Sequence, residues 1–236
     1  MNKKTLSVVL SSGGLDSTTV LALAVSKYGK ENVVAVSVSY GQKHSYELEQ
    51  AKKIAKHYQV KHHLIDLSEI LKFSNCALLQ GSSQDILDKP YDEQIKETGK
   101  VNTYVPFRNG LMLSSIASIA YSLIEDTDYE QAAIMIGNHS DDSAGNAYPD
   151  CSIEFIEAMN KAISYGTYDK IFIEAPFTLL NKSDIVFIGL MLDAPYELTR
   201  SCYKDSEISC GKCSTCIDRL KAFSKNNASD PIPYEK

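Results

Sequence analysis

The feature that most constrains this chain is a turn of glycine and hydroxyl residues between an expected strand and an expected helix. The turn, SGGLDS at residues 12–17, follows an apolar run at 6–10 and precedes a largely apolar stretch at 18–24. The short run suits a buried strand, and the longer stretch suits a helix. Glycine lets backbone N–H groups approach a ligand closely, and the unpaired amides of a helix N-terminus attract anions. We therefore predict a phosphate or pyrophosphate site.

Two common phosphate-binding motifs do not fit this turn. The Walker motif needs a Lys after its second glycine, and the dinucleotide-binding fingerprint needs a third glycine; both are missing. The hydroxyl groups of Ser12, Ser17 and Thr18 supply further donors toward an anion. The alternative is an ordinary strand-to-helix turn rich in Gly and Ser.

Expected strands and helices alternate along the chain. Apolar runs predict further strands at 32–39, 62–67, 132–137 and 170–174. The helices expected between and after them are one from Ser45 as N-cap, one from 109 or 110 to 124, one around 155–163, and, after the last strand, one from Asn181 as N-cap with Asp184 in its first turn. This alternation predicts an α/β fold with a doubly wound parallel five-stranded sheet, in a single domain covering residues 1–236.

Two segments show no clear period. Residues 74–104 are polar and contain Pro90 and Gly99. A segment of that length is expected to be a mobile flap or substrate loop, or else a variable surface excursion. The polar tail after Phe223 is expected to fray.

Composition argues against several classes of protein. The net charge of -6 and the pI of about 5.4 disfavour a broad nucleic-acid-binding surface. No apolar run reaches the roughly 18 residues of a membrane span, and residues 1–4 lead straight into the first expected strand, so we expect a cytoplasmic protein. Only three of the 24 basic residues are arginines. All three, Arg108, Arg200 and Arg219, fall in segments with other signals, which favours binding of carboxylate or phosphate groups.

Four of the six cysteines lie close together near the C-terminus, at Cys202, Cys210, Cys213 and Cys216. The last three are separated by two residues each, a spacing that lets neighbouring thiolates bind one tetrahedral ion, with Cys202 as the fourth ligand. Four thiolates predict a closed, structural Zn²⁺ site within residues 200–223. An iron–sulfur cluster has the same ligands and is the main alternative.

The turn at 12–17 resembles the PP-loop of ATP pyrophosphatases, enzymes that cleave ATP between the α- and β-phosphates and adenylate a substrate. Further motifs follow in order: YGQKH at 40–44, VPFRN at 105–109, YPDC at 148–151, SCY at 201–203 and CGKCSTC at 210–216. Together they resemble the 7-cyano-7-deazaguanine synthase family, QueC, from residue 12 to about 223. The resemblance implies a fold like that of the adenine nucleotide alpha hydrolases.

The resemblance also implies an ATP-dependent ligase that converts 7-carboxy-7-deazaguanine and ammonia into the nitrile 7-cyano-7-deazaguanine, a precursor of queuosine and archaeosine. It implies ATP, Mg²⁺ and Zn²⁺ as cofactors, a small-molecule substrate without nucleic acid or membrane as a partner, and a homodimer. A carboxylate is a poor electrophile, so adenylation would supply AMP as a leaving group. Catalysis would then be mostly positioning and charge stabilisation.

By this resemblance, the ATP phosphates would lie on Ser11, Ser12, Gly13, Gly14, Leu15, Asp16, Ser17, Thr18 and Thr19. Asp16 is expected near Mg²⁺ or as a helix cap, and Lys182 is expected to point at the phosphates or to be a solvated surface lysine. The residues expected in the deazaguanine pocket are Arg108, His139, Asp150, Cys151 and Arg200, because Asp accepts from a guanine-like N–H edge and Arg clamps a carboxylate. Cys151 is alternatively a small buried hydrophobe, and His44 is expected to be structural or exposed.

The chain departs from the family pattern at Ala147, Ser152 and Arg200, where Gly, Arg, and Trp or Leu are common. If the missing Arg holds the substrate carboxylate, Arg200 or Arg108 must replace it, or the substrate differs. Three alternatives remain: a QueC-like enzyme of phage-defence type with another acceptor, a tRNA-modifying PP-loop enzyme, and a non-enzymatic zinc-ribbon module. The second would need a basic face or an added RNA-binding domain, and the third would have no use for a PP-loop.

Overall fold

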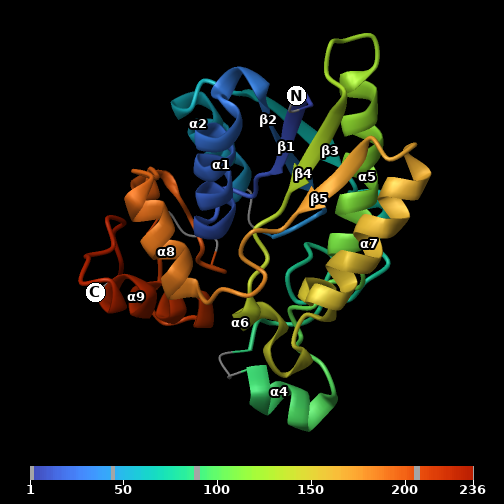
Figure 1. The fold of residues 1–236 in the computed structure, drawn as a ribbon. Helices are drawn as coiled ribbons and strands as arrows, with labels where there is room; N and C mark the ends of the chain where they lie inside the picture. Colours follow the sequence, from blue (N-terminus) through green and yellow to red (C-terminus); the bar gives the residue numbers. More distant parts are fainter. Residues whose placement is uncertain (1–2, 44–45, 88–90, 205–207, 236) are drawn as a thin grey trace.

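A computed structural model describes residues 3–43, 46–87, 91–204 and 208–235. In this part of the chain, five parallel strands form one sheet in the order β3-β2-β1-β4-β5 (Figure 1). The strands are β1 Thr5–Leu10, β2 Val33–Ser39, β3 Lys61–Asp66, β4 Gln131–Met135 and β5 Ile171–Glu174. The predicted doubly wound parallel five-stranded sheet is confirmed.

Helices cover both faces of the sheet, with α1, α2, α8 and α9 on one side and α5 and α7 on the other (Figure 1). The helices in the described ranges are α1 Leu15–Tyr28, α2 Tyr46–His57, α3 Ser68–Leu71, α4 Tyr91–Thr98, α5 Arg108–Ile124, α6 Ser140–Ser143, α7 Ile153–Gly166, α8 Lys182–Met191 and α9 Ser214–Lys225. Short 3₁₀ turns occupy Lys30–Asn32, Ala144–Asn146, Pro149–Cys151 and Tyr196–Leu198. None of the helices described has the length and apolar character to cross a bilayer.

Strand β1 is buried on both faces and lies at the centre of the sheet. Val9 packs into the core beneath α1 and α8, and Val8 packs into the core beneath α5 and α7; neither side chain is exposed. A strand that is covered on both faces is apolar nearly throughout, which explains its continuous hydrophobic run. The chain adds β2 and β3 on one side of β1 and then β4 and β5 on the other side. The strand order therefore reverses between β1 and β4. Sheets of this type bind ligands at the carboxyl ends of the strands beside that change.

The start of α8 has the cap that was expected. The Asn181 side chain accepts hydrogen bonds from the backbone N–H groups of Ser183 and Asp184, at 2.9 and 3.2 Å. The Asp184 carboxylate in turn accepts from the Asn181 N–H, at 3.0 Å. This reciprocal capping box fixes the direction in which α8 leaves β5. The other expected N-cap, Ser45, and the neighbouring His44 lie outside the described residues.

The described part of residues 74–104 is packed against the body of the protein and contains α4, a helix that was not predicted. Its buried apolar residues form two small clusters, one around Leu78 and Leu79 and one around Val101. Gln94 in α4 is 2% exposed, and its side-chain oxygen accepts from the Asn102 N–H at 3.1 Å. Because the buried residues come at irregular intervals, they leave no helical or strand period in the sequence.

The C-terminal tail is also packed, so the expectation that it frays after Phe223 is wrong. Arg219 in α9 forms a two-pronged ion pair with Asp230, with N–O distances of 2.7 and 2.9 Å. The two side chains are 1% and 2% exposed. Arg219 also donates to the Thr199 hydroxyl at 2.6 Å, and the Tyr234 hydroxyl donates to Asp230 at 2.7 Å. The carboxylate that Arg219 binds therefore belongs to the chain itself.

We expect Asp230→Asn to lower the free energy of unfolding by about 3–5 kcal/mol, because it leaves the buried Arg219 charge without its carboxylate. Urea denaturation measures the change. Asp128→Asn is the matched control: it removes the carboxylate of an exposed pair with Lys4, for which a change of about 1 kcal/mol or less is expected. Equal stabilities of the two variants would contradict the structural role of the tail.

Candidate active site

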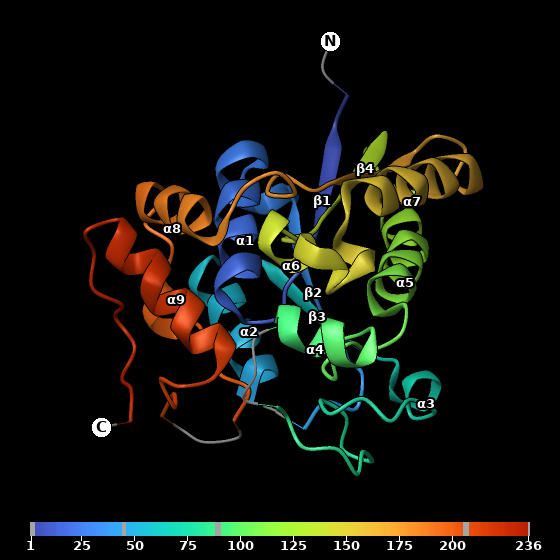
Figure 2. The same cartoon turned by 90° about the horizontal axis from the view of Figure 1, so that it is seen from below.

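A cavity of about 270 Å³ lies at the carboxyl ends of the central strands. Figure 2 looks toward this edge of the sheet, with α2, α4, α6 and α9 around it. Its wall is built by the loop after β1, the turn after β4, the starts of α2, α5 and α8, and the segment that leads into the cysteine cluster. Segments that lie far apart in the sequence thus meet at the point where the strand order reverses, which is where sheets of this topology bind ligands.

The glycine loop takes a conformation that only glycine allows. Gly13 has φ +85°, and a Cβ atom there would lie 2.2 Å from the backbone oxygen of Glu47 in α2. The hydroxyl groups of Ser17 and Thr18 donate to the Gly14 carbonyl at 3.2 and 2.8 Å, which closes the loop onto the first turn of α1. The loop is therefore shaped by its own backbone and by the close approach of α2.

The structure separates the predicted binding residues into two groups. Those that line the cavity are Ser11, Ser12, Gly14, Asp16, Ser17, Arg108, Cys151, Lys182 and Arg200. Those that are not part of its lining are Gly13, Leu15, Thr18, Thr19, His139 and Asp150. The side chains of Leu15, Thr18 and Thr19 are fully buried, and the Thr19 hydroxyl contacts the Tyr196 hydroxyl in the core at 2.7 Å.

Asp16 and Lys182 form an ion pair across the cavity wall. Lys182 Nζ lies 2.6 Å from Asp16 Oδ2, and this contact joins the loop after β1 to the start of α8. Burial opposes the ionised carboxylate, but the interactions with Lys182 and His139 together outweigh it, so the pKa of Asp16 is lowered. Asp16 does not cap α1, whose N-cap is Gly14 with no side-chain hydrogen bond. The other carboxylate oxygen, Oδ1, is buried and has no hydrogen-bond partner among the described residues, so it fits a cation.

The His139 side chain lies next to this ion pair. It is 3% exposed, and its Nε2 lies 3.4 Å from Lys182 Nζ and 3.4 Å from Asp142 Oδ2. Burial raises the pKa of Asp142, although His139 and Lys182 oppose the rise. The structure thus places His139 beside Lys182 and Asp142, outside the lining of the cavity.

Two arginines line a second part of the cavity. Arg108, at the start of α5, lies 5.4 Å above the centre of the Tyr40 ring. The Arg200 guanidinium lies 5.5 Å from the centre of the Tyr46 ring, and its backbone N–H donates to the Gly13 carbonyl at 2.9 Å. Planar guanidinium groups bind carboxylates with two parallel hydrogen bonds, so this part of the cavity suits an anionic substrate group.

Asp150 has a structural partner. Its carboxylate accepts from the backbone N–H of Asn109 at 2.9 Å, and the Asn109 side chain donates to the Asp150 carbonyl and to Cys151 Sγ, both at 3.2 Å. Asp150 therefore holds the start of α5, which carries Arg108. Burial raises the pKa of the Cys151 thiol, so it lines the cavity as a neutral group.

Two departures from the family pattern have structural roles in this chain. Ser152 is the N-cap of α7 and accepts from the Phe155 N–H at 3.2 Å. Ala147 is 2% exposed and packs beside Tyr148 and Cys151. Neither lines the cavity, so Arg108 and Arg200 remain as the arginines that reach it.

Sequence reasoning missed Glu47, a cavity residue in the first turn of α2. Burial raises its pKa to about 7, against the opposing effect of Arg108 and Arg200. An acidic residue in a first helical turn is common, so the pattern carried no sign of a site.

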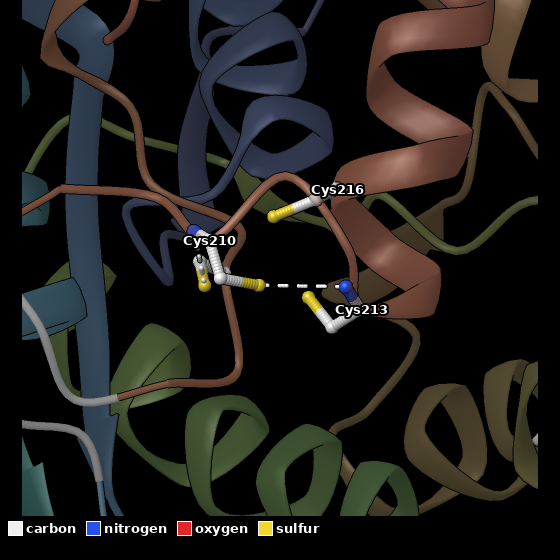
Figure 3. A group of neighbouring side chains, drawn as sticks. Cys210, Cys213 and Cys216 are labelled. Carbon is white, nitrogen blue, oxygen red and sulfur yellow. Dashed lines mark hydrogen bonds between the residues drawn. The ribbon is translucent and has the colours of Figure 1, made fainter. Parts of the chain in front are cut away.

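The four C-terminal cysteines form one compact, buried group, as predicted. Their sulfur atoms all lie within 4.8 Å of one another, and Figure 3 shows Cys210, Cys213 and Cys216 turned toward a common centre. Backbone N–H groups donate to the sulfurs, including Cys213 to Cys210 and Cys210 to Cys202, each at 3.4 Å. Such donors stabilise thiolates, so the group fits a metal with four sulfur ligands.

The central strand, the glycine loop that follows it and the lysine that returns to that loop from α8 define an α/β protein of the PP-loop class. Residues 6–227 match the family described as "Queuosine biosynthesis protein QueC". The chain belongs to the QueC family.

Several relatives align over nearly the whole chain. It is 42% identical to a 7-cyano-7-deazaguanine synthase of Pseudoalteromonas atlantica over 97% of this chain and 98% of the relative. It is 43% identical to one of Thermoplasma acidophilum, over 97% and 92%. Among solved structures, an NH3-dependent NAD synthetase from Campylobacter jejuni superposes with a TM-score of 0.45 at 18% identity, over 96% of this chain and 77% of that one. A TM-score of that size adds nothing to the family assignment.

We expect Glu47→Gln to be more stable than the wild type at pH 8. This gap, the difference in the free energy of unfolding between the two proteins, should shrink toward pH 5.5. The folded carboxyl has a pKa of about 7 against 4.5 in the unfolded chain, so its favourable contribution is present at low pH and lost as the pH rises through about 7. The gap at pH 8 is at most roughly 3 kcal/mol. Thermal unfolding at both pH values measures it. Glu49→Gln, exposed on the same helix, should leave the Tm unchanged; a gap that does not vary with pH would contradict the explanation.

Proposed function

We propose that the chain is a 7-cyano-7-deazaguanine synthase, a ligase that uses ATP to convert 7-carboxy-7-deazaguanine and ammonia into 7-cyano-7-deazaguanine. The observation that carries the proposal is a single cavity that joins the glycine loop and Lys182 to Arg108 and Arg200. One end suits the phosphates of a nucleotide, and the other suits the carboxylate that has to be activated. The names of the full-length relatives support the same reaction. We also expect a homodimer.

The proposed reaction has two halves, each driven by one ATP. A carboxylate oxygen attacks the α-phosphorus and pyrophosphate leaves, giving an acyl adenylate. Ammonia attacks the acyl carbon, AMP leaves with that oxygen, and a proton is lost to give the amide. The amide oxygen then attacks a second α-phosphorus and pyrophosphate leaves. Loss of AMP and of the amide protons forms the C≡N bond, so both carboxylate oxygens end in AMP.

In this proposal the protein contributes position and charge. The loop amides and the serine hydroxyls hold the β- and γ-phosphates, while Lys182 balances negative charge on the departing pyrophosphate. Asp16, with its buried and unpartnered Oδ1, is the residue proposed to hold Mg²⁺, whose role is to neutralise phosphate charge. Arg108 and Arg200 fix the substrate carboxylate so that one oxygen faces the α-phosphorus.

We expect pyrophosphate release that requires both ATP and 7-carboxy-7-deazaguanine, with nitrile formation only when ammonium is present. Substrate labelled with ¹⁸O in both carboxylate oxygens should give two singly labelled AMP per nitrile by mass spectrometry. Lys182→Met should lower the rate of pyrophosphate release roughly 100-fold or more, because a charge at the leaving group is lost.

Lys221→Met, an exposed lysine on α9, is the control and should retain full activity. Unlabelled AMP would exclude adenylation of the carboxylate. Pyrophosphate release that requires tRNA would move the chain to the tRNA-modifying class, and release with a different acceptor would move it to the phage-defence type.

We propose Zn²⁺ for the four-cysteine group and a structural role for it. The sulfur ligands close the coordination shell, so no position is left for water or substrate. The Thr215 hydroxyl, beside Cys216, donates to the Ser201 carbonyl at 2.7 Å, and both residues line the cavity. The metal would thereby hold one wall of the active site in shape.

We expect one zinc per chain by elemental analysis, and Cys213→Ser should lose the zinc and lower the Tm by roughly 10 °C or more, since metal binding contributes folding free energy. Cys76→Ser, at a buried cysteine outside the group, should keep its zinc. Iron with acid-labile sulfide would identify an iron–sulfur cluster instead, and a metal-free protein of full stability would refute the metal site.

A further inference from the structure

Three acidic side chains line the cavity within the described residues, and two of them already have partners. Asp16 is paired with Lys182 at 2.6 Å, and Asp142 lies 3.4 Å from His139. The third is Glu47, whose carboxylate makes no hydrogen bond or salt bridge with the rest of the described chain. Glu47 is half-buried and lines the cavity, so its carboxylate is open to a hydrogen-bond donor of a bound ligand.

The backbone of α2 holds Glu47 firmly in place. The carbonyl oxygen of Glu47 lies directly over Gly13, at a position that any Cβ there would fill. The side chain leaves from the first turn of α2 on the wall that also carries Tyr40. The carboxylate position is therefore tied to the loop that is proposed to hold ATP.

The charges around Glu47 limit what it can bind. Arg108 and Arg200 act electrostatically on its carboxylate and line the same cavity. Two guanidinium charges disfavour an ammonium ion at this position, which argues against Glu47 as the ammonia site. A neutral group with two parallel N–H donors faces no such repulsion and matches the two oxygens of a carboxylate.

We propose that Glu47 is the residue that recognises the substrate base, by accepting hydrogen bonds from the ring N–H and the exocyclic N–H of a 2-amino-4-oxopyrimidine edge. The inference rests on the proposed function, because the base of 7-carboxy-7-deazaguanine has this edge. It replaces Asp150, expected in this role from the sequence but bonded here to the start of α5. Glu47 would restrict the enzyme to guanine-type bases and leave the arginines to the carboxylate.

Equilibrium binding with two ligands tests the proposal: 7-carboxy-7-deazaguanine and its analogue that lacks the 2-amino group. The wild type should bind the first ligand at least about tenfold more tightly, because the analogue leaves a carboxylate oxygen unpaired. In Glu47→Gln and Glu47→Ala, affinity for the first ligand should fall roughly 10- to 100-fold, as expected for lost charged hydrogen bonds, and the preference should disappear. The Kd of ATP should stay unchanged.

Glu49→Gln is the matched control, with the same change of charge on the same helix, and should behave as the wild type. Thermal unfolding confirms that each variant is folded. The proposal is overturned if the Glu47 variants bind 7-carboxy-7-deazaguanine as tightly as the wild type, or if they lose affinity but keep the preference. If the wild type itself binds neither ligand, the proposed function fails and this inference falls with it.

Discussion

The close packing of α2 against the glycine loop is the contact on which the rest of the site depends. Gly13 adopts φ +85° and leaves room for the Glu47 carbonyl where a side chain would otherwise stand. On its other side, the Gly13 carbonyl accepts from the Arg200 N–H at 2.9 Å. One residue without a side chain thus brings the glycine loop into contact with the backbones of Glu47 and Arg200. Because these contacts are made by backbone atoms, the loop has its shape before any ligand arrives.

The charged groups in and beside the cavity fall into two sets that differ in the contacts they make with other charged groups of the protein. Asp16, Lys182, His139 and Asp142 contact one another beside the loop. Such a network keeps Lys182 charged in a buried position and leaves one Asp16 oxygen for a ligand. Arg108 and Glu47 are tied less firmly to the protein: the Arg108 guanidinium contacts Tyr40 at 3.5 Å. In the proposed reaction the first set would bind the phosphates of ATP, and the second would bind the carboxylate and the base edge of the substrate.

The cysteine group and the tail are both linked to the segment of the cavity wall around Arg200. Arg219 joins Asp230 in the tail to Thr199, and Thr199 immediately precedes Arg200. Thr215 joins α9 to Ser201. The wall therefore rests on a buried ion pair on one side and on a metal-binding group on the other. A short polar tail and a cysteine cluster, which look peripheral in the sequence, hold a cavity arginine in position.

The sequence alone determined the parallel sheet, the glycine loop before α1, the cap of α8 and the four-cysteine group, because each depends on neighbours in the chain or on a strict period. Only the tertiary structure decided which polar side chains reach the cavity. Asp150, Thr18 and Thr19 make hydrogen bonds within the protein, whereas Glu47 lines the cavity. The packing of the tail and of α4 was missed for a similar reason, because the side-chain contacts that hold them, Arg219 with Asp230 and Gln94 with Asn102, leave no regular period in the sequence. The local sequence pattern indicates which backbone conformation a segment prefers. The direction of a polar side chain depends instead on the groups that pack beside it, and those groups are brought together only by folding.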